Sequence, residues 1–372
     1  MIKIGITGQD GFVGQHLYNT IGLFPNEFER IPFHRSFFDD KFLLQAFVAQ
    51  CDVIVHLAAK NRHNDPQVIY STNIGLIEKL ISALQDCNSS AHVLFSSSSQ
   101  EQNDNLYGRS KKEGRELLAQ WASQSGGKFT GLIIPNVFGP FGHSYYNSFI
   151  ATFCHQLTHS GKPAIEIDGE VKLIYIADLI KFILAQIRNG LGESAQTVPH
   201  TNQIKVSEIL TILEHFKAAY LEQGIIPDLA TKFELDLFNT FRAYIEHKSH
   251  FPVLYKKHAD ARGSFVEVIR TQAGGQMSFS TTAAGVTRGD HYHTRKIERF
   301  AVIKGKALIQ LRRIGTDEVL EFYLDGNEPA YVDMPVWYTH NIKNIGEEEL
   351  YTNFWINEFY DPNDPDTYFE NV

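Results

Sequence analysis

A glycine-rich turn follows the first apolar stretch of the chain. Lys3–Thr7 is an expected strand, and an expected helix begins at about Phe12. Glycines between a strand and a helix allow a tight turn and let a pyrophosphate approach the free N–H groups of the helix N-terminus. The turn therefore predicts a dinucleotide site, against the simpler alternative of an ordinary βα turn. Its expected contacts are Gly8, Gly11, Phe12, Val13 and Gly14.

The first part of the chain alternates short apolar strands with helical stretches. The expected strands after the first are 52–57, 92–96 and 130–134, and the expected helices are 12–21, 74–85, 111–123 and 206–220. This alternation is typical of a parallel sheet with helices on both faces. It predicts an α/β, doubly wound domain over residues 1–245.

The pattern changes between Tyr244 and Lys256. The expected strands beyond that point are 264–269, 277–281, 300–303, 307–312, 318–324, 330–333 and 350–356, with turns such as Asp325-Gly-Asn327 between them. Closely spaced strands without long helices favour a small antiparallel sandwich or barrel. The chain is therefore predicted to be α/β plus all-β, with a second domain over residues 250–372.

Composition excludes several classes of protein. A net charge of −9 argues against the nucleic-acid backbone as a partner. The three cysteines, Cys51, Cys87 and Cys154, show no Cys-x-x-Cys spacing, which suits a reducing compartment. No signal peptide and no membrane-length apolar run is visible, so we expect a cytoplasmic protein.

A tyrosine and a lysine follow a serine run that ends an expected strand. Tyr107 and Lys111 are four residues apart on an expected helix and so share one face. A nearby ammonium is expected to lower the phenol pKa, so that Tyr107 exchanges a proton with a carbonyl or carbinol oxygen. A serine hydroxyl would hold the same oxygen. Ser98 is the expected serine, with Ser99 as the alternative.

The residue expected to select the cofactor lies beyond the second strand. An acidic residue about twenty positions after the glycines would bind the ribose of NAD, but here the chain carries Arg35. An arginine suits a 2′-phosphate, so we expect NADPH. The alternative is that Arg35 is a solvated surface charge.

Metal-ligand residue types gather in the C-terminal part. His291 and His293 are two apart, so they face the same side of a strand, and Glu298 and His340 complete a set of three imidazoles and one carboxylate. This set suits Zn²⁺, and Fe, Mn or Ni are alternatives. The other interpretation is a metal-free fold with stabilising polar side chains.

Residues 1 to about 245 resemble extended short-chain dehydrogenase/reductases that act on nucleotide sugars, with a Rossmann fold. The motifs that carry the resemblance are His56-Leu57-Ala58-Ala59, Asn73-Ile-Gly75, Tyr107-Gly-Arg-Ser-Lys111, Pro135-Asn136-Val-Phe-Gly139-Pro140 and Tyr175-Ile-Ala-Asp178. The resemblance implies that Tyr107 is the acid/base with Lys111 as its partner. It also implies that Leu57, Ala58, Ala59 and Asn73 contact the cofactor and that Asn136 contacts the substrate. The chain departs from the family at Ile133, where many relatives carry arginine.

The C-terminal part resembles the cupin β-barrel family. Gly285, His291, His293, Glu298 and Gly305 match its first motif, and Pro335, His340 and Asn344 match the second, where Trp337 replaces a usual glycine. Asp260-Ala-Arg262-Gly-Ser-Phe265 resembles the entry strand of sugar-epimerase cupins. There Arg262 would contact a substrate diphosphate, or it is a structural turn residue. Cupins often pair through strands, so we expect a homodimer.

The two parts together resemble the CapF family of bifunctional capsular-polysaccharide enzymes, a match that the tail Asp361-Pro-Asn-Asp-Pro-Asp366 strengthens. The resemblance implies that the cupin epimerises C3 of a UDP-4-keto-6-deoxy-HexNAc and that the reductase then reduces C4 with NADPH. The product would be UDP-2-acetamido-2,6-dideoxy-L-talose, on the UDP-L-FucNAc pathway. The alternatives are a reductase whose cupin is structural or oligomerising, an N-terminal dehydratase or 4-epimerase, and a cupin oxygenase.

Overall fold

The computed structural model describes all residues, Met1–Val372, and forms two compact units. The first comprises Met1–Thr152 and Ile167–Val206, and the second comprises Phe153–Glu166 and Ser207–Val372. Residues 207–245 thus pack with the C-terminal part in space. The division of the sequence into functional domains at 1–245 and 250–372 stays a prediction.

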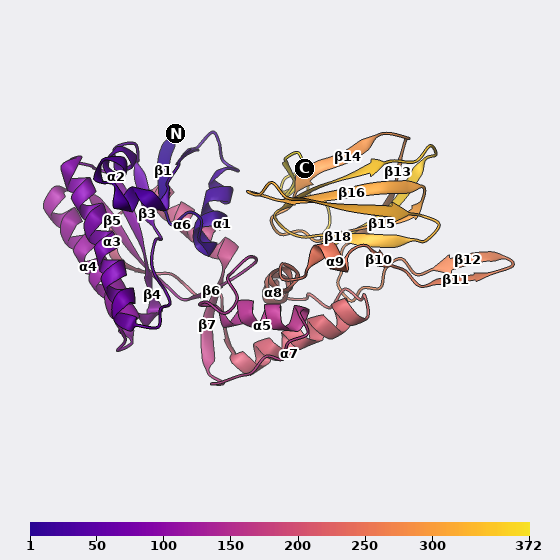
Figure 1. The fold of residues 1–372 in the computed structure, drawn as a ribbon, viewed down its shortest axis with the longest axis horizontal. Coiled ribbons are helices and arrows are strands. Elements are labelled where there is room, and N and C mark those ends of the chain that lie inside the picture. Colours follow the sequence, from indigo (N-terminus) through magenta and orange to yellow (C-terminus); the bar gives the residue numbers. More distant parts are fainter. The chain divides into compact units, whose positions relative to one another are not determined.

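A six-stranded parallel sheet forms the centre of the first unit (Figure 1). Its strands, in spatial order, are β2 (Phe28–Ile31), β1 (Ile2–Thr7), β3 (Val53–His56), β4 (His92–Ser98), β5 (Lys128–Ile134) and β8 (Glu193–Thr197). Ile4 of β1 pairs with Arg30 of β2 on one side and with Val53 of β3 on the other. After β1 the chain forms β2 on one side of β1 and then β3 on the other side, so the strand order reverses at β1. Ligands of open α/β sheets bind at the carboxyl ends of strands at such a point.

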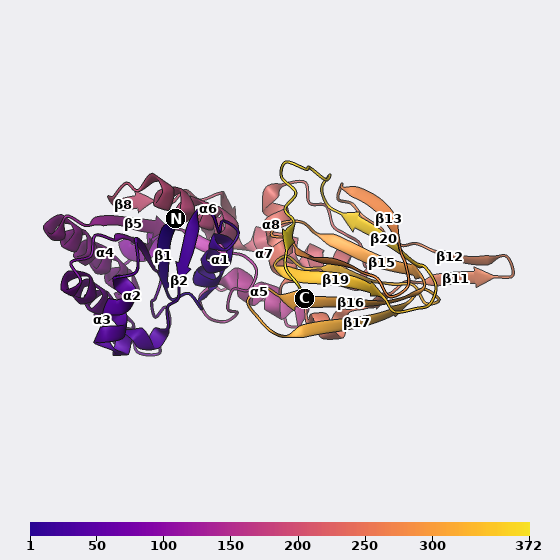
Figure 2. The same ribbon diagram turned by 90° about the horizontal axis from the view of Figure 1, so that it is seen from above.

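Helices cover both faces of this sheet (Figure 2). The contacting helices α2 (Lys41–Val48), α3 (Pro66–Asp86) and α4 (Leu106–Ser125) lie on one face, and α1 (Phe12–Ile21) and α6 (Ile176–Asn189) contact each other on the opposite face. A buried cluster that includes Phe47, Leu80, Phe95 and Trp121 fills the α2–α4 side. The predicted doubly wound α/β fold is therefore confirmed.

Helix α3 begins at Pro66 rather than at Ile74, where the sequence pattern placed its start. The Asp65 carboxylate accepts a hydrogen bond from the Gln67 N–H, and proline suits the first helical position. The added turns contain β-branched and polar residues whose periodicity is weak, so the cap marks this end better than the pattern does.

Three further strands and two short 3₁₀ helices complete the first unit. They are the sheet of β6 (Asn136–Phe138), β7 (Glu170–Tyr175) and β9 (Asn202–Lys205), together with η1 (Arg35–Asp39) and η2 (Ser99–Gln102). None of the helices combines the length and hydropathy needed to cross a membrane.

The second unit contains two five-stranded sheets with antiparallel pairing. One, in spatial order, is β10 (Val253–Leu254), β18 (Ala330–Met334), β15 (Glu298–Lys304), β20 (Leu350–Ile356) and β13 (Gln276–Thr282); the other is β17 (Val319–Asp325), β16 (Lys306–Arg313), β19 (Tyr338–Asn344), β14 (Thr287–Tyr292) and β21 (Tyr368–Phe369). Apolar side chains such as Phe300, Val302, Ile309 and Ile342 form their shared core. The predicted all-β C-terminal part is confirmed.

Strands β14 and β19 are absent from the predicted set, although they carry His291 and His340. The sequence of β14, Thr-Arg-Gly-Asp-His-Tyr, has no apolar alternation, and its ladder is interrupted between Gly289 and His291. A strand whose inner face carries polar ligands lacks the period-2 signal on which strand prediction depends.

Helices pack against this β structure within the second unit. They are α7 (Val206–Phe216), the π-helical turn η3 (Lys217–Glu222), α8 (Lys232–Arg242) and α9 (His247–His250), while α5 (Phe149–Thr158) enters from the first unit. The Tyr220 hydroxyl donates to Asp333 (2.6 Å), and Arg242 Nη2 donates to the Met334 carbonyl (2.9 Å). These buried bonds explain why residues 207–245 belong to this unit.

Candidate functional site

The glycine turn forms one wall of a cavity of about 940 Å³ in the first unit. Gly8 has φ +78°, and Gly11 N–H closes the turn on the Gly8 carbonyl (3.0 Å). A Cβ at Gly14 would overlap that same carbonyl oxygen, so the turn needs glycine at this position. The five residues expected to contact the cofactor here, Gly8, Gly11, Phe12, Val13 and Gly14, all line the cavity.

The second expected cofactor motif follows β3. Leu57, Ala58 and Ala59 line the cavity, but Asn73 is not among its lining residues. The buried Asn73 amide instead accepts from the Lys60 backbone N–H (2.7 Å) and donates to Ser110 Oγ (3.0 Å). In this structure Asn73 holds the loop after β3 against α4.

Tyr107 and Lys111 project from α4 into the same cavity. Lys111 Nζ donates to the Ser96 carbonyl (2.8 Å) and lies 5.8 Å from the centre of the Tyr107 ring. Burial lowers the pKa of Lys111 to about 8. Burial raises the pKa of Tyr107 to about 12, although a hydrogen bond with Ser98 acts in the other direction. The expectation of a lowered phenol pKa is therefore wrong for this structure, because desolvation is the largest effect on Tyr107 and raises its pKa. A protonated phenol at neutral pH is the form that a general acid needs.

The structure separates the two candidate serines. Ser98 is the last residue of β4 and lines the cavity, whereas Ser99 is exposed and does not. Ser98 Oγ also accepts from the Gln100 backbone N–H (3.2 Å), which orients it at the strand end. Asn136 lines the cavity too, and its amide donates to the Lys172 carbonyl (3.3 Å).

Other cavity residues were missed because they lie on loops. Asn61, His143 and Tyr146 line the cavity, and the Asn61 N–H donates to the Tyr146 hydroxyl (3.3 Å). No periodic pattern marks these positions in the sequence. No aspartate or glutamate lines the cavity, so nothing there repels a diphosphate.

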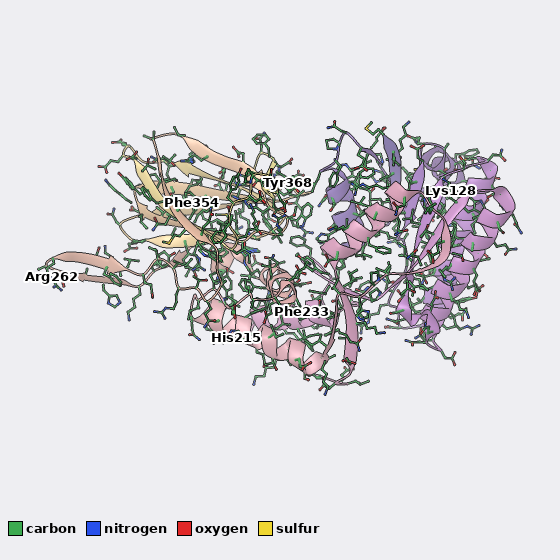
Figure 3. The ribbon with its side chains drawn as sticks, turned by 180° about the vertical axis from the view of Figure 1, so that it is seen from behind. Lys128, His215, Phe233, Arg262, Phe354 and Tyr368 are labelled. Atoms are coloured by element: carbon green, nitrogen blue, oxygen red, sulfur yellow. The ribbon has the colours of Figure 1, made fainter.

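Two expected ligand-binding arginines do not line this cavity. Arg35 opens η1, is exposed and does not line the cavity. Arg262 lies in the second unit, at the tip of the exposed hairpin of β11 (Lys257–Asp260) and β12 (Gly263–Val266) (Figure 3). Its side chain is 90% exposed and pairs with Asp260 (2.6 Å). Their predicted roles stay predictions.

The four expected metal ligands meet in the second unit. One ligand atom from each of His291, His293, Glu298 and His340 lies within 4.8 Å of the others. Glu298 Oε2 is 3.0 Å from His293 Nε2 and 3.2 Å from His340 Nε2.

The surroundings of these side chains suit a cation. His293 Nδ1 donates to the Asp366 carbonyl (2.5 Å) and His340 Nδ1 to the Tyr338 carbonyl (3.2 Å), which leaves both Nε2 atoms directed at the cluster. Those two nitrogens and Glu298 Oε2 are buried without a hydrogen-bond partner. Backbone acceptors on the far nitrogen are typical of metal-binding histidines. The residues present therefore fit a divalent cation.

The electrostatics of two of these side chains, His291 and Glu298, also suit a cation. Burial lowers the pKa of His291 to about 4, and the neighbouring His340 and His293 add to the effect, so His291 is neutral at pH 7. Burial acts to raise the pKa of Glu298, but its contacts with His293 and His340 outweigh burial and hold this pKa well below its usual range. A neutral imidazole and an ionised carboxylate are the forms that bind metal.

Comparison with known proteins covers the whole chain. The NAD dependent epimerase/dehydratase family matches residues 4–198, and the polysaccharide biosynthesis C-terminal domain family matches residues 258–368. The UDP-2-acetamido-2,6-beta-L-arabino-hexul-4-ose reductase of Pseudomonas aeruginosa is 32% identical over 374 residues, which are 99% of this chain and 98% of that protein.

Two solved structures extend the comparison. The capsular polysaccharide assembling protein CapF from Staphylococcus aureus has 34% identity and a TM-score of 0.64, covering 99% of this chain and 100% of its own. RMD from Pseudomonas aeruginosa, complexed with NADPH, has 20% identity and a TM-score of 0.54, covering 58% of this chain and 82% of its own. The likeness to RMD concerns the fold alone.

Proposed function

Because this chain belongs to the NAD dependent epimerase/dehydratase family and, over its whole length, to the family of CapF, we propose that it is a bifunctional UDP-sugar enzyme of capsule or O-antigen synthesis. Its substrate is a UDP-4-keto-6-deoxy-HexNAc. The C-terminal part epimerises C3, and the N-terminal part reduces C4 to give UDP-2-acetamido-2,6-dideoxy-L-talose. The observation that carries the proposal is the full-length similarity to a reductase of a UDP-linked 4-keto sugar.

The cavity of the first unit supports the reduction. The glycine turn and the loop after β3 would hold NADPH, which supplies a hydride to the C4 carbonyl when bound. Tyr107, protonated at neutral pH, donates its proton to the C4 oxygen, and the Ser98 hydroxyl donates a hydrogen bond to the same oxygen. The buried Lys111 ammonium stabilises the negative charge that develops on the phenol.

The histidine cluster of the second unit supports the epimerisation. A divalent cation, with zinc our first choice, would be held by His291, His293, Glu298 and His340 and would polarise the C4 carbonyl as a Lewis acid. A proton on C3 is acidic only while C4 is a carbonyl, since the carbanion must delocalise onto that oxygen. Epimerisation therefore precedes reduction, and reduction locks the C3 configuration.

A monofunctional reductase with a structural or oligomerising cupin is the second candidate. The name of the Pseudomonas aeruginosa relative favours it, because that name describes reduction alone. The two candidates differ in whether solvent deuterium enters the keto sugar at C3.

The deciding experiment incubates the full chain with the UDP-4-keto sugar in D₂O, with and without NADPH, and follows the sugar by NMR. The bifunctional proposal predicts deuterium at C3 without NADPH and a reduced C4 when NADPH is added. Tyr107→Phe should keep the exchange and abolish reduction, and His291→Ala should abolish exchange. Tyr70→Phe on α3 and His200→Ala, which change residues outside both sites, serve as matched controls. Reduction of the supplied ketone without any C3 exchange would leave only the monofunctional candidate.

Cofactor choice needs its own test. We propose NADPH, with Arg35 binding its 2′-phosphate as a bidentate guanidinium. Arg35→Ala should weaken NADPH binding about tenfold or more and leave NADH binding unchanged, measured by quenching of intrinsic fluorescence. An equal loss of affinity for NADPH and NADH would show that Arg35 does not bind the 2′-phosphate. The homodimer also stays a prediction, which sedimentation equilibrium tests directly.

A further inference from the structure

One ligand of the histidine cluster lies outside the ladders that place the others. His291 is in β14, Glu298 begins β15 and His340 is in β19, and each is paired with neighbouring strands. His293 follows the end of β14 and begins the irregular connection 293–297. The strand ladders therefore do not include His293, although its carbonyl accepts from the Trp337 N–H (2.7 Å), and its ring needs a further restraint.

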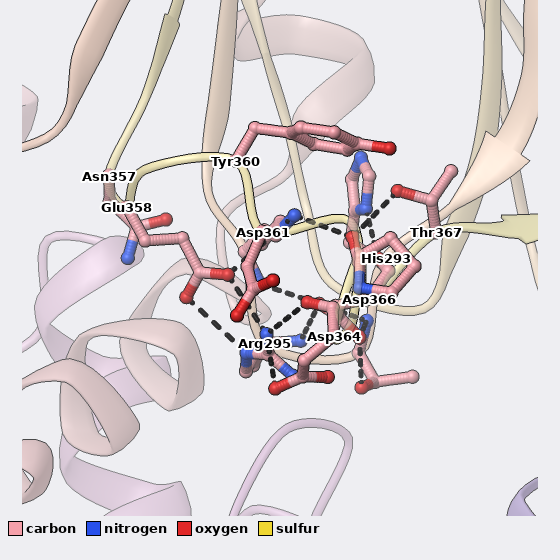
Figure 4. A network of polar contacts seen from close by, with 12 residues as sticks. His293, Arg295, Asn357, Glu358, Tyr360, Asp361, Asp364, Asp366 and Thr367 are labelled. Atoms are coloured by element: carbon pink, nitrogen blue, oxygen red, sulfur yellow. Dashed lines mark hydrogen bonds and ion pairs between the residues drawn. The ribbon is translucent and has the colours of Figure 1, made fainter.

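Asp366, in the C-terminal tail, holds the His293 ring and the connection 293–297 (Figure 4). The Asp366 carbonyl accepts from His293 Nδ1 at 2.5 Å. Its carboxylate accepts from three successive backbone N–H groups, those of Thr294 (3.1 Å), Arg295 (3.0 Å) and Lys296 (3.1 Å), and from the Thr294 hydroxyl (2.6 Å). Successive backbone N–H groups around one anion form a nest, which fixes the backbone of the connection.

Side chains of the connection also bond to the tail. Arg295 Nη2 donates to the Asp364 carbonyl (3.0 Å) and pairs with Glu358 (3.0 Å), and the buried Lys296 Nζ donates to the Pro365 carbonyl (2.5 Å). Figure 4 shows Arg295 joined to Glu358 and Asp364 of the tail. Asp366 itself is only 2% exposed and has φ +39°, a conformation that aspartate and asparagine tolerate better than other non-glycine residues.

We propose that Asp366 is a positioning residue for the metal centre: it holds His293 in the tautomer and orientation that direct Nε2 at the cation. The inference rests on the proposed function, because it concerns the same four-residue cluster. Asp366 bonds to Nδ1 of His293 and not to its Nε2, to Nε2 of His340 or to Oε2 of Glu298, so it acts through His293 and the connection. A second-sphere partner of this kind commonly changes metal affinity ten- to a hundredfold.

A purely structural Asp366 makes a different prediction. If it served only to pack the tail, its loss would lower the melting temperature without altering the affinity or spectrum of a metal bound by the folded protein. The test must therefore report on the metal itself, in a variant that keeps the fold.

The experiment uses the full chain stripped of metal and titrated with Zn²⁺ against a chromophoric chelator at fixed pH, and with Co²⁺ for its d–d absorption. Asp366→Asn keeps the size and the backbone preference of the residue but removes its charge, and Asp366→Ala removes the carboxylate that accepts from the three backbone N–H groups. The backbone carbonyl stays in both variants, so an effect on the metal would come from the altered placement of that carbonyl and of His293. Asp317→Asn, an exposed carboxylate between β16 and β17, removes the same charge elsewhere. An unchanged far-UV circular dichroism spectrum confirms that each variant is folded.

We expect Zn²⁺ affinity to fall ten- to a hundredfold in both Asp366 variants, the Co²⁺ bands to shift in position or intensity, and Asp317→Asn to match the wild type. Wild-type affinity and Co²⁺ spectrum in folded Asp366→Asn and Asp366→Ala would overturn the inference and leave the metal site intact. A wild-type chain that binds neither ion would instead refute the proposed metal centre, and the inference with it.

Discussion

Replacing Lys111 by methionine tests the reductase mechanism most directly. The Lys111 side chain is buried, and its Nζ lies 5.8 Å from the centre of the Tyr107 ring. Methionine keeps the apolar stem and removes the charge. The loss of this charge should raise the free energy of the transition state, because the phenol becomes negative as Tyr107 gives its proton to the sugar oxygen.

The distance sets the size of the loss. At 5.8 Å and an effective dielectric constant of about 20, two unit charges attract by about 3 kcal/mol. About 1.4 kcal/mol corresponds to a factor of ten in rate, so kcat for reduction should fall about a hundredfold. KM should change little, since the lost attraction exists only as charge develops.

The same charge predicts a pH dependence. Burial lowers the pKa of Lys111 to about 8, so the ammonium is present below that pH and is lost as the pH rises through it. The phenol of Tyr107, with its pKa raised to about 12, stays protonated over this range. Reduction by the wild type should therefore slow above pH 8. Lys111→Arg, which stays charged, should lose this alkaline fall, and Lys111→Met should be uniformly slow.

Oxidation of NADPH with the keto sugar, followed by absorbance from pH 6.5 to 9.5, measures all three enzymes. Lys112→Met, which changes the exposed neighbour, is the matched control. Activity of Lys111→Met within a few-fold of wild type would refute the electrostatic argument. So would an alkaline fall that persists in that variant.

Three further predictions follow from other parts of the molecule. Gly14→Ala, whose Cβ would overlap the Gly8 carbonyl, should destabilise the turn by about 1–3 kcal/mol and abolish NADPH binding by fluorescence, whereas Gly75→Ala, with no atom within 4 Å of the new Cβ, should leave binding unchanged. Asp333→Ala leaves the buried Arg299 guanidinium without its carboxylate partner, so the free energy of unfolding of the second unit in urea should fall by about 3–5 kcal/mol. A fall below about 1 kcal/mol would contradict this prediction. Chelation of the metal should stop deuterium uptake at C3 without slowing reduction of an already epimerised ketone, and Zn²⁺ should restore the exchange; exchange that survives chelation would refute the metal's role.

Local rules made much of the fold predictable. The turn from Gly8 to Gly14 depends on backbone conformations that glycine alone adopts easily, and these act over a few residues. Tyr107 and Lys111 share a helix face through the α-helical period, and the structure brings both into the cavity. Strands such as β20, predicted within its observed bounds, show the apolar pattern that burial imposes.

Polar strands and loop residues could not be predicted from these local patterns. Strand β14 has no apolar alternation, and it carries the polar ligand His291. His143 lines the cavity from a loop, where no period links sequence to position. The lowered phenol pKa expected for Tyr107 was wrong because burial, unlike spacing, cannot be counted along the chain.

The sequence by itself determined the two fold classes, the glycine turn, the tyrosine–lysine pair and the set of residues able to hold a metal, because each depends on residue type and short spacing. Only the tertiary structure decided that Asn73 bonds to Lys60 and Ser110, and that residues 207–245 pack with the β sheets. It alone placed Asp366 beneath His293, 73 residues away along the chain. Such contacts arise when the whole chain minimises exposed apolar area and unpaired polar groups together, so no local segment encodes them.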